Sequence, residues 1–183
     1  SPKEKPMSKA VIDALVERFP DAVYDPYVGV GGDDCAFVKR ESIVEVCRFL
    51  KAESGFDMAP YVTAVDYLGQ TPRFEVVYNL YATKANARVR LRVKVGEGEE
   101  LPSVTSVWRG ASWFERYCFD MYGIQIAGHP DLRRILMWDG FKDHPMRKDY
   151  VEVDDYEWEP TPHDDVLEKA RRHYPAPPAA ESA

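Results

Sequence analysis

Two histidines stand next to carboxylates in the second half of the chain, where a general base or a metal ligand is conceivable. His129 lies in Gly128-His129-Pro130-Asp131, and His144 lies in Asp143-His144-Pro145. The chain has no HExxH, no pair of histidines four residues apart and no Gly-x-Ser-x-Gly. Because each histidine precedes a proline, which favours extended backbone, we interpret both as loop histidines that hydrogen-bond the backbone. A free-standing enzyme that uses either of them is a competing hypothesis.

Glu115 and Asp120 are the next candidates for acid–base chemistry. They lie five residues apart in a segment of helical periodicity, Trp113 to Tyr122, so their side chains point in substantially different directions. Arg116 and Asp120 are four residues apart and are placed to pair along the helix. We interpret these charges, together with Asp131-Leu132-Arg133-Arg134, as groups that hold a bent loop or contact a partner.

The sequence lacks the motifs that usually bind nucleotides, iron–sulfur clusters or metals. The glycine-rich stretch Gly29 to Asp34 is neither GxGxxG nor a P-loop and leads into a strand-like run, so we predict a hairpin turn with positive φ. Cys35, Cys47 and Cys118 are far apart and form no CxxC, which disfavours an iron–sulfur or zinc site. We expect no catalytic, cofactor-binding or metal-binding residue in this chain.

The length of the chain is sufficient for one domain with a core plus an arm, or for two very small domains. The chain has 183 residues, of which 45% are hydrophobic, and no apolar run approaches the length of a membrane-spanning helix. Its charged start does not resemble a signal peptide. The net charge is −7, and residues 152–168 contribute −8, which leaves +1 for the remainder. A nearly neutral body with an acidic segment argues against general nucleic-acid binding.

Hydrophobic periodicity predicts which helices and strands carry the residues discussed above. We expect helices over 9–19, 41–52 and 113–122, and strands over 23–27, 35–39, 61–68, 74–81 and 87–95. Pro26 would confine the first strand to a sheet edge. This order predicts an α/β protein of the α+β sandwich type, with a mostly antiparallel sheet and helices on one face.

The expected strand over residues 87–95 has the most regular pattern in the chain. Its apolar residues alternate with Arg88, Arg90, Arg92 and Lys94, so one face lies on the core and the other points away. The cations indicate either a solvated face that discourages aggregation or a cationic stripe that faces an acidic partner.

Regular periodicity ends at Gly123. Residues 130–183 contain seven of the fourteen prolines, together with many apolar and aromatic residues. An extended but apolar chain must bury itself, either on its own sheet or on another subunit. We therefore expect a compact domain over 1–122, an extended partner-binding arm over 123–160, and a short helix with a disordered tail over 161–183.

Three blocks of this region resemble the C subunit of the bacterial NADH–quinone oxidoreductase, respiratory complex I. The blocks are Glu115-Arg116-x-x-x-Asp120-x-Tyr122-Gly123-Ile124, Gly128-His129-Pro130-Asp131-Leu132-Arg133-Arg134-Ile135-Leu136 and His144-Pro145-Met146-Arg147-Lys148-Asp149-Tyr150. Upstream stretches such as Thr63-Ala64-Val65-Asp66-Tyr67-Leu68 are also similar, so the resemblance covers about residues 10–150. Tyr117 stands where the family usually has Glu, which removes one charge from the helix.

The resemblance implies a structural subunit of a proton-translocating NADH dehydrogenase. It would dock to the D subunit, which holds the quinone site, and to cluster-bearing subunits on the cytoplasmic side of the bacterial inner membrane. FMN, iron–sulfur clusters, NADH and quinone would be bound by other subunits. The equivalent subunit of a membrane-bound hydrogenase or formate hydrogenlyase is the alternative. The motif residues expected at the interface are Glu115, Arg116, Asp120, Gly123, His129, Pro130, Asp131, Arg133, Arg134, His144, Pro145, Arg147, Lys148, Asp149 and Tyr150.

Overall fold

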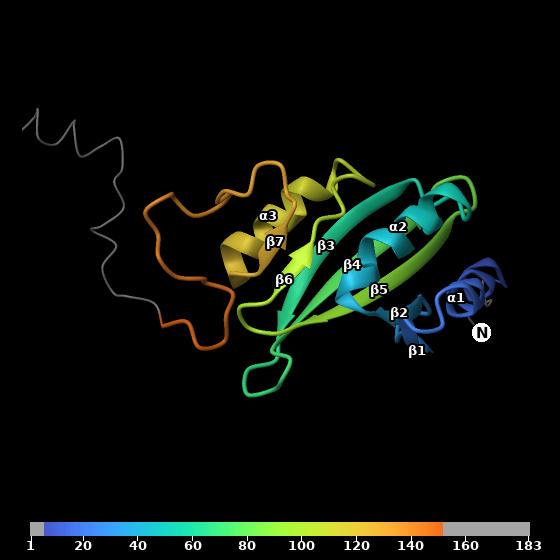
Figure 1. Ribbon diagram of the computed structural model, residues 1–183, viewed down its shortest axis with the longest axis horizontal. Helices are drawn as coiled ribbons and strands as arrows, with labels where there is room; N and C mark the ends of the chain where they lie inside the picture. The colour runs from blue at the N-terminus through green and yellow to red at the C-terminus, as the bar shows by residue number, and fades with distance from the viewer. Residues whose placement is uncertain (1–5, 152–183) are drawn as a thin grey trace, which may run out of the picture. The chain divides into compact units, whose positions relative to one another are not determined.

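A computed structural model describes residues 6–151 of the chain, with side chains from residue 10 onward (Figure 1). The expected helix and the acidic segment beyond residue 151 lie outside these described residues. The elements are α1 (Pro6–Arg18), β1 (Val23–Val28), β2 (Asp34–Val38), the 3-10 helix η1 (Arg40–Ser42), α2 (Ile43–Ala52), β3 (Met58–Asp66), β4 (Phe74–Ala82), β5 (Ala87–Val95), β6 (Glu100–Pro102), α3 (Ala111–Tyr122) and β7 (Gln125–Ala127).

The main sheet has five strands in the order β1-β2-β5-β4-β3. β3, β4 and β5 form an antiparallel meander, β1 and β2 form an antiparallel hairpin, and β2 joins β5 in parallel. The expectation of a mostly antiparallel sheet with helices is therefore confirmed. The parallel pairing of β2 with β5 was not predicted, because a sequence pattern does not show which strands become neighbours.

The β1–β2 hairpin follows its turn residues. β1 is an edge strand, as Pro26 predicts, and its register shifts between Tyr24 and Tyr27. The turn closes where the amide of Gly29 donates to the carbonyl of Asp33, 2.8 Å away. Gly32 has φ of 79°, so the prediction of a hairpin turn that needs positive φ is confirmed.

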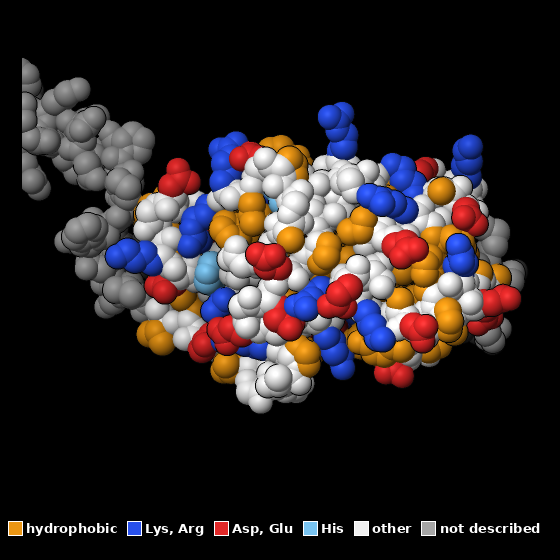
Figure 2. All heavy atoms as spheres, viewed as in Figure 1, with side chains coloured by type: hydrophobic (Ala, Val, Ile, Leu, Met, Phe, Trp, Pro, Cys, Tyr) orange, Lys and Arg blue, Asp and Glu red, His pale blue; other side chains and the backbone are white. Residues whose placement is uncertain are grey.

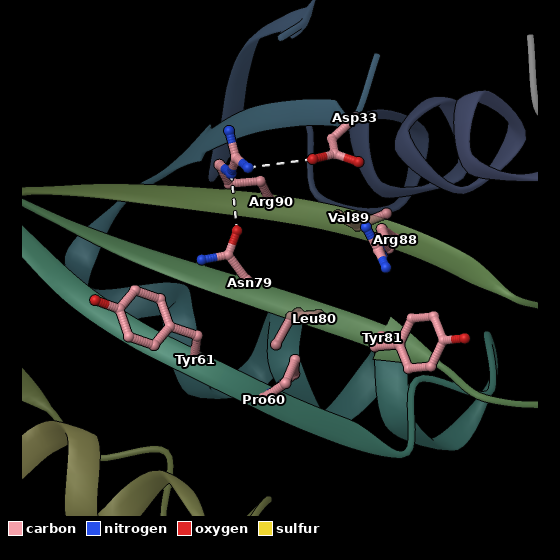
Figure 3. A pocket seen from close by; sticks show the side chains of 9 residues that line it. All are labelled: Asp33, Pro60, Tyr61, Asn79, Leu80, Tyr81, Arg88, Val89 and Arg90. Carbon is pink, nitrogen blue, oxygen red and sulfur yellow. Dashed lines mark hydrogen bonds and ion pairs between the residues drawn. The ribbon is translucent and has the colours of Figure 1, made fainter. Parts of the chain in front are cut away.

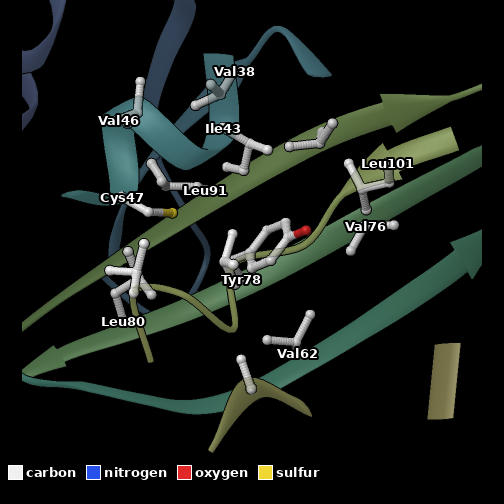
Figure 4. Close-up of a cluster of buried hydrophobic side chains, with 14 of the residues drawn as sticks. Val38, Ile43, Val46, Cys47, Val62, Val76, Tyr78, Leu80, Leu91 and Leu101 are labelled. Atoms are coloured by element: carbon white, nitrogen blue, oxygen red, sulfur yellow. The ribbon is translucent and has the colours of Figure 1, made fainter. Parts of the chain in front are cut away.

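One face of the sheet carries the hydrophobic core. The apolar residues of β5, including Leu91, point to this face and are buried, as the alternation predicts. Tyr78 of β4 and the buried side of α2 pack against them. Figure 4 shows this cluster, which includes Val38, Ile43, Val46, Cys47, Val62, Val76, Leu80 and Leu101.

The helices leave the other face of the sheet largely uncovered. α2 lies across the strands in Figure 1, and α1 packs on β1, β2 and β5 through Ile12 and Leu15, which belong to the same core. α3 runs along the edge strand β3. Figure 2, which is drawn from the same side as Figure 1, shows charged side chains of both signs interspersed on that side of the molecule.

A second, two-stranded sheet continues the compact fold beyond α3. β7 begins just after the helix and pairs in parallel with β6, with Leu101 opposite Ile126. Contacts between residues join the described residues as far as Tyr150 into one compact unit, whereas the sequence predicts a division at residue 122. Three-residue strands are too short to show a periodicity, which explains why β6 and β7 were missed.

Within residues 6–151, none of the helices has the length and apolar character required to cross a bilayer.

Candidate partner-binding segment

The residues after β7 turn back along α3 and form what we call the arm, residues 128–150. Gly123, which ends α3, makes this return possible. It has φ of 74°, and its amide donates to the carbonyl of Phe119 at 2.9 Å, as predicted for a glycine that stops the helix. His144 and Arg147 pack directly on it, because a Cβ at this position would lie 2.5 Å from Nε2 of His144 and from Nη2 of Arg147.

Asp120 is the main anchor of the arm. Its carboxylate is fully buried, and Oδ2 accepts the amides of Ile135, Leu136 and Met137 at 3.0, 2.8 and 2.9 Å. Burial by itself would raise the pKa of Asp120. These amides and the guanidinium of Arg134 outweigh that effect and hold the pKa below its usual value.

Arg116 provides a second anchor on the same helix. Its Nε donates to the carbonyl of Arg133 at 3.0 Å, and its Nη2 donates to the carbonyl of Arg134 at 2.7 Å. Its guanidinium carbon lies 5.4 Å from the centre of the Trp113 ring. Arg116 and Asp120 were expected to pair with each other, but each instead binds the arm, because the arm offers both carbonyls and amides.

Arg133 and Arg134 have different environments. Arg134 Nη1 lies 2.6 Å from Asp120 Oδ1, and its side chain is 13% exposed. Arg133 pairs with Asp131 at 2.9 Å, and its side chain is 68% exposed. Both arginines were expected to meet a partner, but Arg134 uses its charge inside the chain and only Arg133 presents it on the surface.

The end of the arm is fastened to the C-terminal end of α3. His144 Nδ1 donates to the carbonyl of Asp120 at 2.8 Å, and Arg147 Nε donates to the carbonyl of Tyr122 at 2.6 Å. Burial lowers the pKa of His144. His144 is thus a loop histidine bonded to backbone, as interpreted from the sequence.

A cluster around Arg73 holds the last residues of the arm against the β3–β4 turn. Arg73 is bidentate to Asp66, with both distances 2.9 Å, and its Nη2 lies 2.5 Å from Asp149 Oδ1. The amide of Lys148 donates to Asp66 Oδ2 at 2.8 Å. The hydrogen bonds from Arg73 lower the pKa of Asp66. The sequence pattern predicts no role for Asp66 or Arg73, although Asp66 lies in a stretch that resembles the family.

Glu115 points away from Asp120, as their spacing predicts, and enters a separate buried network. Its carboxylate accepts Ser103 Oγ at 2.6 Å and the amide of Val104 at 2.7 Å. His129 Nε2 lies 4.0 Å from Glu115 Oε2, and its Nδ1 accepts the amide of Asp131. Burial raises the pKa of Glu115 to about 7 despite the two hydrogen bonds.

The remaining motif residues complete the arm. Pro130 and Lys148 are exposed and Pro145 is half-buried. The ring of Tyr150 lies 6.3 Å from that of Phe141, which stacks edge-on with Trp138. The inner side of the arm thus has a complete environment within its own chain. Of the two surfaces that the sequence left open for this segment, these residues use their own chain, and contact with another subunit stays a prediction.

The outer side of this region is apolar at several points. Trp113 is 61% exposed, Leu136 65% and Met146 47%. Trp113 lies on α3 beside Arg116. In the arm, the amide of Leu136 donates to the carboxylate of Asp120, and the amide of Met146 donates to the carbonyl of Met121. The backbone is therefore fixed and the apolar side chains face outward, which is typical of a preorganised protein-binding surface.

Residues that could hold a metal or a reactive thiol are not gathered at this surface. Residues 6–151 contain no group of three or more His, Cys, Asp and Glu side chains arranged for a metal ion. Cys35, Cys47 and Cys118 are all buried, and burial raises the pKa of the Cys47 and Cys118 thiols. The charged residues of this region instead form hydrogen bonds and ion pairs that fix the arm on α3.

Comparisons with known proteins give a consistent result. Residues 36–156 match the family described as the 30 kDa subunit of the respiratory-chain NADH dehydrogenase. The C 2 subunit of the NADH-quinone oxidoreductase of Rhizobium etli is 49% identical over 138 residues, covering 74% of this chain and 73% of that protein. The C subunit of the Geobacter metallireducens enzyme is 47% identical over 145 residues, covering 78% of this chain and 88% of that relative.

A solved structure shares the fold. A chain of the membrane-bound sulfane sulfur reductase, an archaeal respiratory membrane complex, superimposes with a TM-score of 0.67 and is 20% identical. The match covers 91% of this chain and 90% of the other.

Proposed function

Because the chain belongs to the family of the 30 kDa subunit of the respiratory-chain NADH dehydrogenase, we propose that it is a non-catalytic peripheral subunit of an NADH–quinone oxidoreductase. It holds neighbouring peripheral subunits in place, chiefly the D subunit, which holds the quinone site, and cluster-bearing subunits. FMN, clusters, NADH and quinone are bound by those partners, on the cytoplasmic side of the bacterial inner membrane. The relatives named above are themselves subunits of NADH-quinone oxidoreductases.

The single observation that carries this proposal is that the arm bonds its polar groups to its own chain but exposes apolar side chains on its outer side. Its backbone and charged groups are used inward, as the bonds of Asp120 and Arg73 exemplify. Its exposed apolar side chains, Leu136 and Met146, have no such use within the described chain and are 65% and 47% exposed. Apolar anchors on a rigid backbone give affinity without an ordering cost on binding.

The experiment is to replace Leu136 and Met146 by Asp in the native complex, purified through a tag on another subunit. We expect the amount of this chain retained in the complex, and NADH:quinone activity, to fall together by about tenfold, as for two moderately strong interface anchors. The isolated variant should unfold at the same denaturant concentration as the wild type, because both side chains are exposed.

The matched control is Val30→Asp, at the tip of the β1–β2 hairpin, where the residue is fully exposed. Full retention of the Leu136→Asp/Met146→Asp variant in the complex would refute docking through the arm. NADH:quinone activity in the isolated wild-type chain would refute the non-catalytic role and revive a site at His129 or His144.

The alternative partner set belongs to a related membrane-bound hydrogenase or formate hydrogenlyase. The shared fold with the sulfane sulfur reductase chain shows that this architecture also occurs in another respiratory machine. The genes next to this one decide the question. Neighbouring genes that encode flavin- and NADH-binding subunits would support the proposal. A neighbouring gene that encodes a hydrogenase subunit with nickel-ligand cysteines would support the alternative.

A further inference from the structure

The uncovered face of the sheet carries a row of four cations. Arg88, Arg90, Arg92 and Lys94 all point to the side of β5 opposite the core. Across the strands they stand opposite Tyr81, Asn79, Val77 and Glu75 of β4. We call this surface the cationic face. α3 reaches only its border, where the rings of Phe114 and Tyr61 meet at 5.6 Å.

The cations outnumber the acids of this face. Arg90 pairs with Asp33 at 3.1 Å and also donates to Asn79 at 2.8 Å, and Arg92 lies 2.7 Å from Glu75. Arg88 and Lys94 are exposed and form no ion pair with any of residues 6–151. Ion pairs and a hydrogen bond thus hold Arg90 and Arg92 in place, while Arg88 and Lys94 have no acidic partner among the described residues.

A hollow of roughly 350 Å³ lies at one end of the cationic face. Tyr61 and Tyr81 stand on either side of it, and Arg88 and Arg90 border it (Figure 3). Figure 3 also shows Arg90 held between Asp33 and Asn79. The hollow can accept an apolar side chain, while the row of cations beside it requires negative charge from the same partner.

We propose that the cationic face binds an extended, acidic segment of a neighbouring protein subunit. Alternate residues of a strand repeat at about 6.8 Å on each face, so the charges of β5 and those of an extended partner share one spacing. A segment with Asp or Glu at alternate positions places one carboxylate near Arg88 and another near Lys94. Charge complementarity of this kind gives specificity and orientation.

A protein partner fits this face better than a nucleic acid. Arg92 lies 5.9 Å from the centre of the Tyr27 ring and Lys94 5.1 Å from that of Phe37, and Arg88 lies 5.7 Å from that of Tyr81. Each of these three rings already has a cation of the same surface near it, so that side of the ring is not available for stacking on bases.

This inference rests on the proposed function, because it takes the acidic segment from another subunit of the same assembly. It concerns a different surface from the arm, so each claim can fail alone. If the chain does not co-purify with the complex, the proposed function fails. If the chain co-purifies but the cationic face has no acidic neighbour, only the present inference fails.

The test is zero-length carbodiimide cross-linking of the purified complex, which joins a lysine amine to a carboxylate in direct contact. We expect mass spectrometry to find Lys94 joined to an Asp or Glu of a different subunit. The control variant Lys94→Arg keeps the charge but lacks the amine, so this cross-linked peptide should vanish while assembly is unchanged.

The other possible occupants give different results. A cross-link from Lys94 to residues 152–168 of this chain, or to a second copy of it, would overturn the proposal. So would the absence of any Lys94 cross-link in the intact complex. Binding of a labelled single-stranded DNA by the isolated chain, abolished by Lys94→Glu, would assign the face to nucleic acid instead.

Charge reversal provides the quantitative test. Arg88→Glu combined with Lys94→Glu should reduce retention of the chain in the complex by about fivefold to tenfold at moderate salt, as expected when two partly exposed ion pairs become repulsive. Arg48→Glu, on the exposed side of α2, reverses one charge elsewhere and should retain wild-type assembly. The single variant Lys94→Glu, which changes the net charge by the same amount, should by contrast reduce assembly. Equal retention of both variants would overturn the proposal.

Discussion

Oδ1 of Asp120 lies 2.6 Å from Nη1 of Arg134, while Oδ2 of the same carboxylate accepts three successive backbone amides. A single buried side chain on α3 therefore sets both the position and the backbone direction of the arm. Four donors compensate the cost of burying the charge, so the position requires a carboxylate.

Asp120→Asn should release the arm without melting the sheet. The amide group keeps the shape but removes the charge and brings donors toward Arg134 and the three amides, at a cost of about 3 kcal/mol. Hydrogen exchange at the amides of Ile135 to Met137 should then accelerate by about a hundredfold. Asp131→Asn, at an exposed pair, is the control and should leave these rates within a factor of about two. Unchanged exchange in Asp120→Asn would show that the carboxylate is not the anchor.

The two neighbouring arginines should behave differently when their charge is reversed. Arg134→Glu places a second carboxylate against buried Asp120, so we expect local unfolding of the arm, detected as new protease cleavage between residues 128 and 150. Arg133→Glu changes a side chain that is 68% exposed and should leave proteolysis and stability unchanged. Reduced assembly in Arg133→Glu would then report a direct partner contact. Protease resistance in Arg134→Glu would contradict an internal role.

Gly123→Ala should be much more disruptive than the same change at another glycine with positive φ. Both Gly123 and Gly98 have a left-handed backbone, with φ of 74° and 78°. A Cβ at Gly98 meets nothing within 4 Å, so Gly98→Ala should cost only the backbone term of about 1 kcal/mol. At Gly123 the added methyl must also displace His144 and Arg147, and denaturant unfolding should show a loss about 2 kcal/mol larger. Equal losses of stability in the two variants would show that His144 and Arg147 move away from the added methyl group at no cost.

Glu115 should make the stability of the protein depend on pH in a predictable direction. Its pKa in the folded state is about 7, above the ordinary value of 4.5, so folding favours the protonated form. Stability contributed by this group is present at low pH and is lost as pH rises from about 4.5 through 7. Glu115→Gln mimics the neutral carboxyl and can still accept the amide of Val104 and donate to Ser103.

The measurement is denaturant unfolding of the wild type and Glu115→Gln at pH 5 and pH 8. Relative to the wild type, the variant should gain up to about 3 kcal/mol between these values, since one pKa unit corresponds to about 1.4 kcal/mol. Asp57→Asn, at a solvent-exposed carboxylate, is the control and should leave the pH slope near neutrality unchanged. A parallel slope in Glu115→Gln would show that the group is ionised throughout.

The sequence was informative where a local pattern has a direct structural consequence. The alternation along β5 identified the buried face correctly, because strand side chains alternate whatever their neighbours are. Pro26 placed β1 at an edge, and Gly123 marked the end of α3, because both residues restrict or permit specific backbone angles.

The arm was harder to predict because its stability comes from contacts distant in the sequence. Arg73 meets Asp149, which is 76 residues away, and no local periodicity shows this pair. The apolar residues after Gly123 divide between the two surfaces that composition left open: Ile124 and Ile126 are buried in their own chain, whereas Leu136 and Met146 are exposed. The roles of Asp66, at the end of β3, and of Arg73, just before β4, needed the three-dimensional arrangement, since neither belongs to a recognisable local pattern.

The position of β5 between β2 and β4 has a consequence for synthesis on the ribosome. β2 ends at Val38, whereas its parallel partner begins at Ala87, so the amino-terminal hairpin cannot join the sheet until about fifty further residues have been made. At about 5 to 20 residues per second this delay lasts several seconds. The β3–β4–β5 meander has only short connections, and we expect it to form first and act as the template for β2. Of the five strands of the main sheet, β1 and β2 are then synthesised first but join the sheet last.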